Sequence, residues 1–167
     1  MQSPVIKYFL MFVVLVAVQI LILNQIQFSG YINPYVYVLF IMLLPLNSQR
    51  YAVLLLSFLI GLTIDIFSNT LGMHAFASVF IAYLRPGIIR VITNREEDMS
   101  EYPGLAQTGF SWFLSYAAIM VIIHHTVLFY IEVFTLNNFF NTLSRAILSS
   151  VFSIFVIVLS QFIVFRD

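Results

Sequence analysis

The sequence of 167 residues contains no cysteine and very few charged residues. The absence of cysteine excludes disulfide bonds, thiolate metal ligands and a thiol nucleophile. Only 8% of the residues are charged, whereas soluble domains carry about 25%. Because 62% of the residues are hydrophobic and the mean hydropathy is +1.02, the composition excludes a soluble globular protein and predicts an integral membrane protein.

An excess of positive charge is also missing. Seven basic residues balance seven acidic ones, so the release of counterions cannot drive binding to nucleic acid, and we expect no nucleic-acid partner. The three histidines lack the spacing of a zinc-binding helix, and the sequence has no phosphate-binding loop, dinucleotide fingerprint or Gly-x-Ser-x-Gly elbow. We therefore expect no metal, no cofactor and no enzymatic activity. An intramembrane hydrolase whose catalytic dyad joins distant residues is the enzymatic alternative.

Long apolar runs are what the sequence has in abundance. A helix that crosses about 30 Å of hydrocarbon needs roughly 20 mostly apolar residues. Six runs are candidates, at residues 6–23, 31–46, 51–67, 71–84 with a continuation to 92, 108–131 and 143–165. The second is short and contains Pro34 and Pro45. The runs predict an all-α integral membrane protein, a single six-helix transmembrane bundle over residues 1–167, with the third and fourth helices as antiparallel neighbours.

The basic residues predict the direction of the six helices, because they accumulate on the cytoplasmic side of a membrane. With a cytoplasmic N-terminus, Arg145 alone falls outside. The other six basic residues fall inside: Lys7, Arg50, Arg85, Arg90, Arg95 and Arg166. Both termini are thus expected in the cytoplasm. The charged loop at residues 92–107 is interpreted as a solvated connector, with the docking of a cytoplasmic partner as the alternative.

Ionisable residues within a membrane span are candidates for function, because each costs at least a few kcal/mol unless it is paired or hydrated. Ser57, Gly61 and Asp65 share one face of the third helix at intervals of four residues. The short link to the fourth helix brings His74 to the same depth, which predicts a hydrogen bond between His74 and Asp65. Glu132 and Arg145 are expected to pair with each other or to lie in interfacial water.

Two other polar groups within the spans are given structural interpretations. Ser149, Ser153 and Gln161 lie in phase on the sixth helix, and small residues of this kind usually form helix-packing surfaces. His124 and His125 could form a proton relay, but adjacent side chains on a helix point about 100° apart. We therefore expect one of these histidines to pack and the other to bond a neighbour.

The third and fourth helices carry a resemblance to a known family. The stretch GLTIDIFSNTLGMHA at residues 61–75, followed by Tyr83-Leu84-Arg85, resembles the signature hairpin of the rod shape-determining protein MreD family. Within this hairpin, the residues that match the recurring positions of the family are Gly61, Asp65, Leu71, Gly72 and Ala75. The Asn33-Pro34 and Leu44-Pro45 pairs that flank the second helix also look similar to the family pattern.

The resemblance implies a noncatalytic subunit of the bacterial cell-elongation (rod) complex in the cytoplasmic, or inner, membrane. Its direct partner would be MreC, a protein with one transmembrane helix, and through MreC it would work with the MreB filament and the glycosyltransferase and transpeptidase pair that makes peptidoglycan. We expect the small-residue faces to receive the MreC helix and Asp65 to fix its register. Such faces would serve a homodimer equally well, and the sequence does not decide whether a lipid or other small molecule binds between the helices.

A second function follows from the family's fold, which is similar to that of the substrate-binding subunits of energy-coupling-factor transporters. The alternative is therefore a membrane subunit that binds a small, vitamin-type solute. Those subunits usually carry an Ala-x-x-x-Ala pair in an early helix, whereas this sequence has Ala17 alone, with Val13 and Leu21 at the matching positions. This departure counts against the transporter alternative.

Overall fold

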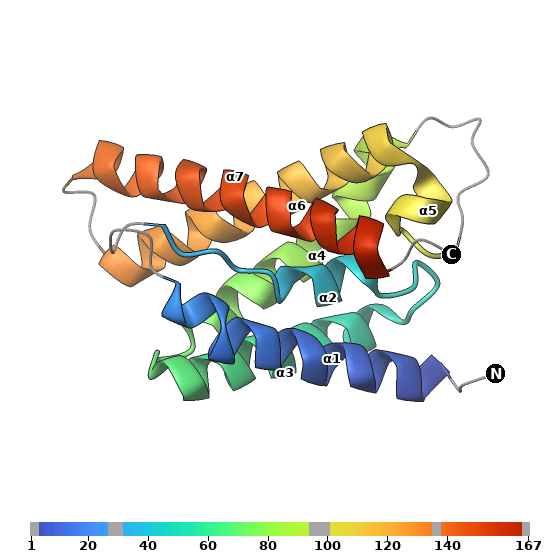
Figure 1. Cartoon of the computed structure of the whole chain (residues 1–167), viewed down its shortest axis with the longest axis horizontal. Helices are drawn as coiled ribbons and strands as arrows, with labels where there is room; N and C mark the ends of the chain where they lie inside the picture. The colour runs from blue at the N-terminus through green and yellow to red at the C-terminus, as the bar shows by residue number, and fades with distance from the viewer. Residues whose placement is uncertain (1–3, 27–31, 94–100, 135–137, 165–167) are drawn as a thin grey trace.

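The regular structure of the chain is helical in the computed structural model, which describes residues 4–26, 32–93, 101–134 and 138–164 (Figure 1). In chain order the elements are α1 (Pro4–Leu21), the 3-10 helix η1 (Leu23–Gln25), α2 (Val38–Leu43), α3 (Arg50–Ser68), α4 (Met73–Ile92), α5 (Leu105–Thr108), α6 (Phe110–Val133) and α7 (Phe139–Val164). Among these described residues, five helices are long and apolar enough to cross a membrane, namely α1 with η1, α3, α4, α6 and α7. The prediction of a multi-pass helical membrane protein is confirmed.

The predicted helix over residues 31–46 is wrong in its extent, because within the described residues 32–46 only Val38–Leu43 is helical. Six helical residues rise about 9 Å, which is far less than the hydrocarbon thickness. A non-helical stretch at residues 32–37 precedes α2 and follows the direction of the long helices (Figure 1). Residues 35–44 are all buried, so this stretch lies inside the protein, where backbone groups can find partners that lipid does not offer.

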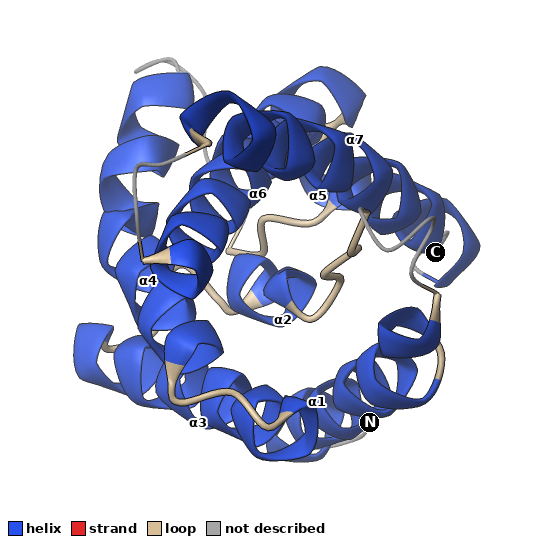
Figure 2. Ribbon diagram, turned by 90° about the vertical axis from the view of Figure 1, so that its left-hand side faces the viewer, coloured by secondary structure: helices blue, strands red, loops and turns tan. Residues whose placement is uncertain are grey.

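The long helices surround α2 (Figure 2). Phe40, Ile41 and Met42 are 0–1% exposed. We call the end of the bundle where α1 begins and α7 finishes the near end, and the opposite end, with η1 and the α3–α4 link, the far end (Figure 1). Figure 2 also places α6 and α1 on opposite sides of α2. The buried centre of this bundle is therefore a short helix and a non-helical stretch.

The hairpin of α3 and α4 confirms the prediction of antiparallel neighbours, and these helices form the most extensive pair in the bundle. α3 ends at Ser68, and the next residue, Asn69, adopts a left-handed conformation with φ 54°. The amides of Asn69 and Thr70 both donate to the carbonyl of Asp65. Gly72 then has φ 81° directly before α4. These two left-handed positions, three residues apart, reverse the chain tightly, as asparagine and glycine permit.

Part of the charged connector lies outside the described residues. This part, residues 94–100, includes Arg95, and the terminal Arg166 also lies outside the described residues. The interpretation of the connector as a solvated loop or a docking site therefore stays a prediction. Its described end lies at the near end of the bundle, where the carbonyl of Glu101 accepts a hydrogen bond of 3.0 Å from the amide of Leu46.

Candidate functional site

Asp65 lies in the last turn of α3 and is 2% exposed. Its Oδ1 atom accepts hydrogen bonds from Thr70 Oγ1 at 2.5 Å and from the His74 amide at 3.0 Å. The predicted bond to the imidazole is present, with His74 Nδ1 at 3.0 Å from Oδ1. Oδ2 accepts from the Ala75 amide at 2.9 Å. A single buried carboxylate thus has four donors around it.

These bonds make Asp65 the cap of α4. The first amides of a helix have no partner within the helix, and Gly72, at the capping position, has no side chain to supply one. The carboxylate reaches over from α3 and accepts two of these amides, and its negative charge is favourable at the positive end of the helix dipole. The cost of burying the Asp65 carboxylate in a membrane span is therefore offset by hydrogen bonds within the chain.

Gly61 lies one turn before Asp65 and allows α4 to approach closely. A Cβ atom at this position would lie 2.5 Å from the Cα of Ala75 and 2.6 Å from the carbonyl oxygen of His74. Both are backbone atoms, so neither can move without displacing the helix. Gly61 therefore permits the close approach of a helix, and that helix is α4 of the same chain.

We expect Gly61→Ala to destabilise the protein by about 1–3 kcal/mol, because the new methyl group must push α3 and α4 apart. The matched control is Gly87→Ala in α4, where a Cβ would meet nothing within 4 Å. There alanine should be neutral or stabilise by up to about 1 kcal/mol through its helix propensity. Unfolding of both variants in detergent micelles measures the difference, and equal stability of the two would contradict the close packing.

The predicted pair of Glu132 and Arg145 is also present. Arg145 Nη1 donates to Glu132 Oε1 at 3.2 Å, and the two side chains are 20% and 38% exposed for arginine and glutamate. The guanidinium carbon lies 4.4 Å from the centre of the Phe129 ring. With its amide oriented to satisfy both neighbours, Asn33 accepts from Arg145 Nη2 at 2.8 Å. The pair therefore joins α6, α7 and the start of the non-helical stretch.

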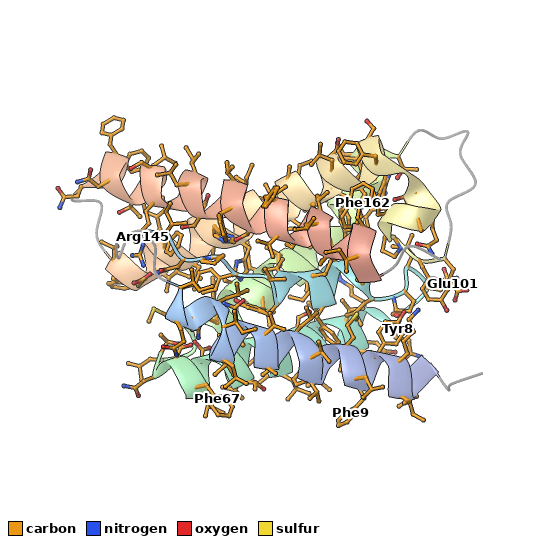
Figure 3. The ribbon with its side chains drawn as sticks, viewed as in Figure 1. Tyr8, Phe9, Phe67, Glu101, Arg145 and Phe162 are labelled. Carbon is orange, nitrogen blue, oxygen red and sulfur yellow. The ribbon has the colours of Figure 1, made fainter. Side chains whose placement is uncertain are left out.

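A cavity of about 370 Å³ at the far end brings these groups together. His74, Glu132 and Arg145 line it, and Asp65 lies behind His74. Figure 3 shows Arg145 at this end of the bundle. The remaining polar side chains of the lining are Asn24, Gln25, Asn33, Tyr35, Ser68 and Thr70. Asp65, His74, Glu132 and Arg145 thus lie together at the far end of the bundle.

The sequence did not reveal what the buried polar residues in the centre do. Gln19 of α1 is 0% exposed; its amide nitrogen donates to the carbonyl of Pro34 at 2.9 Å, and its oxygen accepts from the Val36 amide at 2.8 Å. Ser149 and Ser153 of α7 accept from the amides of Asn33 and Tyr35, at 3.1 and 2.9 Å respectively. These side chains replace the backbone bonds that a helix would have made.

The interpretation of the two adjacent histidines is wrong, because both bond a neighbour. His124 Nε2 lies 2.7 Å from the Tyr37 hydroxyl, and His125 Nε2 lies 2.9 Å from Ser153 Oγ. Both rings also contact Tyr35, with ring centres 6.2 and 5.4 Å away. Adjacent side chains on a helix point about 100° apart, but Tyr35 of the non-helical stretch lies between the two rings and contacts both.

Arg85, one of the basic residues predicted to lie on the cytoplasmic side, is buried within the bundle. It is 4% exposed, and its Nε donates to the Tyr116 hydroxyl at 2.9 Å. Its Nη2 donates to the carbonyls of Met42 and Leu44 at the end of α2. The Tyr116 hydroxyl in turn donates to Met42 at 3.2 Å. A cation thus satisfies the carbonyls that the short helix leaves free.

The small-residue faces are occupied within the chain. Ser57 is 0% exposed and donates to the carbonyl of Val53 at 2.7 Å. Gly61 faces α4, and Ser149 and Ser153 face the non-helical stretch. The expectation that these faces receive a partner helix is therefore corrected, because this chain already fills them. A partner must bind elsewhere on the surface.

The groups that line the far-end cavity can form hydrogen bonds and ion pairs with a polar ligand. Within the described residues there is no group of three or more histidine, aspartate or glutamate side chains placed to hold a metal ion. The cavity offers one ion pair, one imidazole backed by a carboxylate, and several amides and hydroxyls. Comparison of the chain with family models, with curated proteins and with solved structures finds no match in any of the three.

Proposed function

We propose that the chain is a noncatalytic subunit of the bacterial cell-elongation complex in the cytoplasmic membrane, similar to the MreD family, and that it binds MreC. The observation that carries the proposal is the contact between the residues of the family hairpin. Asp65 caps α4 through the amide of Ala75, and Gly61 lies against the backbone of the same residue. Gly72 supplies the left-handed turn between them. A motif match by chance would not be expected to form one interlocked unit.

The proposed place for the MreC helix is the exposed side of α1. Of the five long helices, α1 has the smallest buried share. Leu10, Val14 and Leu21 are 47%, 55% and 72% exposed, and their positions fall within an arc of about 40° around the helix. A single transmembrane helix has the shape to cover such an apolar stripe, and packing between helices holds such pairs together in lipid.

Photo-crosslinking tests this placement without disturbing the fold. A photoreactive amino acid at Leu10, Val14 or Leu21 should form a crosslink to MreC in cells, whereas the same residue at Ile122 should not. Ile122 is 46% exposed, close to the 47% of Leu10, but lies on α6 across the bundle. Crosslinks from Ile122 alone, or equal crosslinks from all four positions, would contradict the proposed place.

The function itself is tested by complementation and co-purification. In a rod-shaped bacterium that lacks its own MreD gene, the chain should restore rod shape and should co-purify with MreC. Round cells that contain the folded chain at normal amounts would contradict the proposal. A chain that retains a vitamin-type solute and no single-helix partner would instead support the alternative of a transporter subunit.

A further inference from the structure

The far-end cavity places opposite charges on one lining. Glu132 and Arg145 face each other at 3.2 Å and both remain partly exposed. A ligand with only an anionic group would meet Glu132 with the same charge, and the carboxylate of Asp65 lies close behind His74. A ligand with only a cationic group would meet Arg145. The lining therefore favours a ligand that carries one charge of each sign.

Two buried nitrogen atoms of this lining have no partner among the described residues. His74 is 4% exposed, and its Nε2 makes no hydrogen bond; Arg145 Nε makes none either. Because the Asp65 carboxylate can only accept, His74 Nδ1 must carry the hydrogen of their bond. Buried polar atoms without partners are rare in native proteins, and these two lie directly behind the polar surface of the cavity, each with less than 1 Å² accessible.

We propose that the cavity binds a zwitterionic group, an ammonium and an oxyanion a few bonds apart, as in a free amino acid or in the headgroup of phosphatidylethanolamine. Arg145 would receive the carboxylate or phosphate, for which a guanidinium is well shaped. Glu132 would accept hydrogens from the ammonium. The volume of about 370 Å³ lies within the range of about 300–1,000 Å³ for small-molecule sites. The proposal stands independently of MreC binding.

The test uses the full chain in lipid nanodiscs and separates the two sources of the zwitterion. In the first arm, native mass spectrometry compares retained lipid after assembly in phosphatidylethanolamine with phosphatidylglycerol or in phosphatidylglycerol alone. In the second arm, L-alanine is titrated against thermal unfolding in phosphatidylglycerol nanodiscs. Retention of about one phosphatidylethanolamine per chain assigns the lipid headgroup, and a saturable rise in melting temperature with L-alanine assigns the free amino acid.

Three variants decide whether the signal comes from this cavity. Arg145→Gln and Glu132→Gln should each weaken the retention or the affinity at least tenfold. Arg90→Gln removes an exposed cation at the near end of α4 and should leave both unchanged. Emission from Trp112, which lies on α6 away from the cavity lining, checks that each variant is folded. Binding in neither arm, or wild-type binding by folded Arg145→Gln and Glu132→Gln, would overturn the proposal.

Discussion

Replacing Asp65 with leucine is expected to destabilise the protein by about 3–5 kcal/mol, the size of the loss when one partner is removed from a buried charged network. The substitution leaves two amides at the start of α4, the Thr70 hydroxyl and His74 Nδ1 without their acceptor. His74 and Ala75 are each 4% exposed, so their amides cannot turn to water, whereas the Thr70 hydroxyl and His74 Nδ1 lie 3.1 Å apart and can bond each other. Unfolding in detergent micelles, followed by heat or by titration with a denaturing detergent, measures the loss.

Asp65→Asn separates the charge from the hydrogen bonds. One carbonyl oxygen remains to accept from part of the donor set, so we expect a loss that is smaller than that of Asp65→Leu. The matched control is Thr63→Val on the same helix, which removes a bond of 2.7 Å from Thr63 to the carbonyl of Leu59 and should cost less than about 1 kcal/mol. Stability of Asp65→Leu equal to that of Thr63→Val would contradict the capping role.

This structural role of Asp65 changes what its replacement says about a partner. An unstable Asp65→Leu chain would fail to support MreC binding even if MreC never approached Asp65. Loss of rod shape in that variant therefore does not locate an interface, whereas crosslinks from the exposed α1 positions do. Variants with intact stability and altered crosslinks are the informative ones for the interface.

The α3–α4 hairpin could be predicted from the sequence because everything that forms it is local. The link is short, Gly61 and Ser57 repeat at a helical interval, and Asp65 and His74 are separated by only nine residues. The same local reasoning predicted the pair of Glu132 and Arg145, 13 residues apart. Short separations leave few arrangements, so spacing and depth were enough.

The non-helical stretch at residues 32–37 could not be predicted in the same way. Hydropathy measures only how apolar a segment is, so it does not distinguish a transmembrane helix from a non-helical stretch that is buried within the protein. What makes the irregular backbone stable is a set of acceptors from other helices, with Ser149 116 positions from Asn33 and Ser153 118 positions from Tyr35. The serines looked like packing residues on their own helix because their partners are far away in the sequence. Gln19, a polar residue in the most apolar helix, was the one local sign of such a partner.

The largest remaining effect is expected at Arg85, whose replacement by leucine should cost about 3 kcal/mol, because lost charge-assisted bonds and an orphaned buried carbonyl add together. The carbonyl of Leu44 loses the donor given by Arg85, and Met42 keeps only the Tyr116 hydroxyl. Arg85→Lys keeps the charge but loses the planar fork that reaches Tyr116 and α2 together. We therefore expect Arg85→Lys to lower the free energy of unfolding, but by less than Arg85→Leu does.

Hydrogen exchange shows whether this loss arises at α2, as the geometry requires. In Arg85→Leu the amides of residues 38–44 should exchange faster than in the wild-type chain, because the end of α2 is no longer held. Arg90→Gln, an exposed arginine on the same helix, should leave exchange at residues 38–44 unchanged. Slow exchange at α2 in a destabilised Arg85→Leu chain would contradict the assigned role, since the bonds of Arg85 to α2 would then contribute nothing to holding the buried centre.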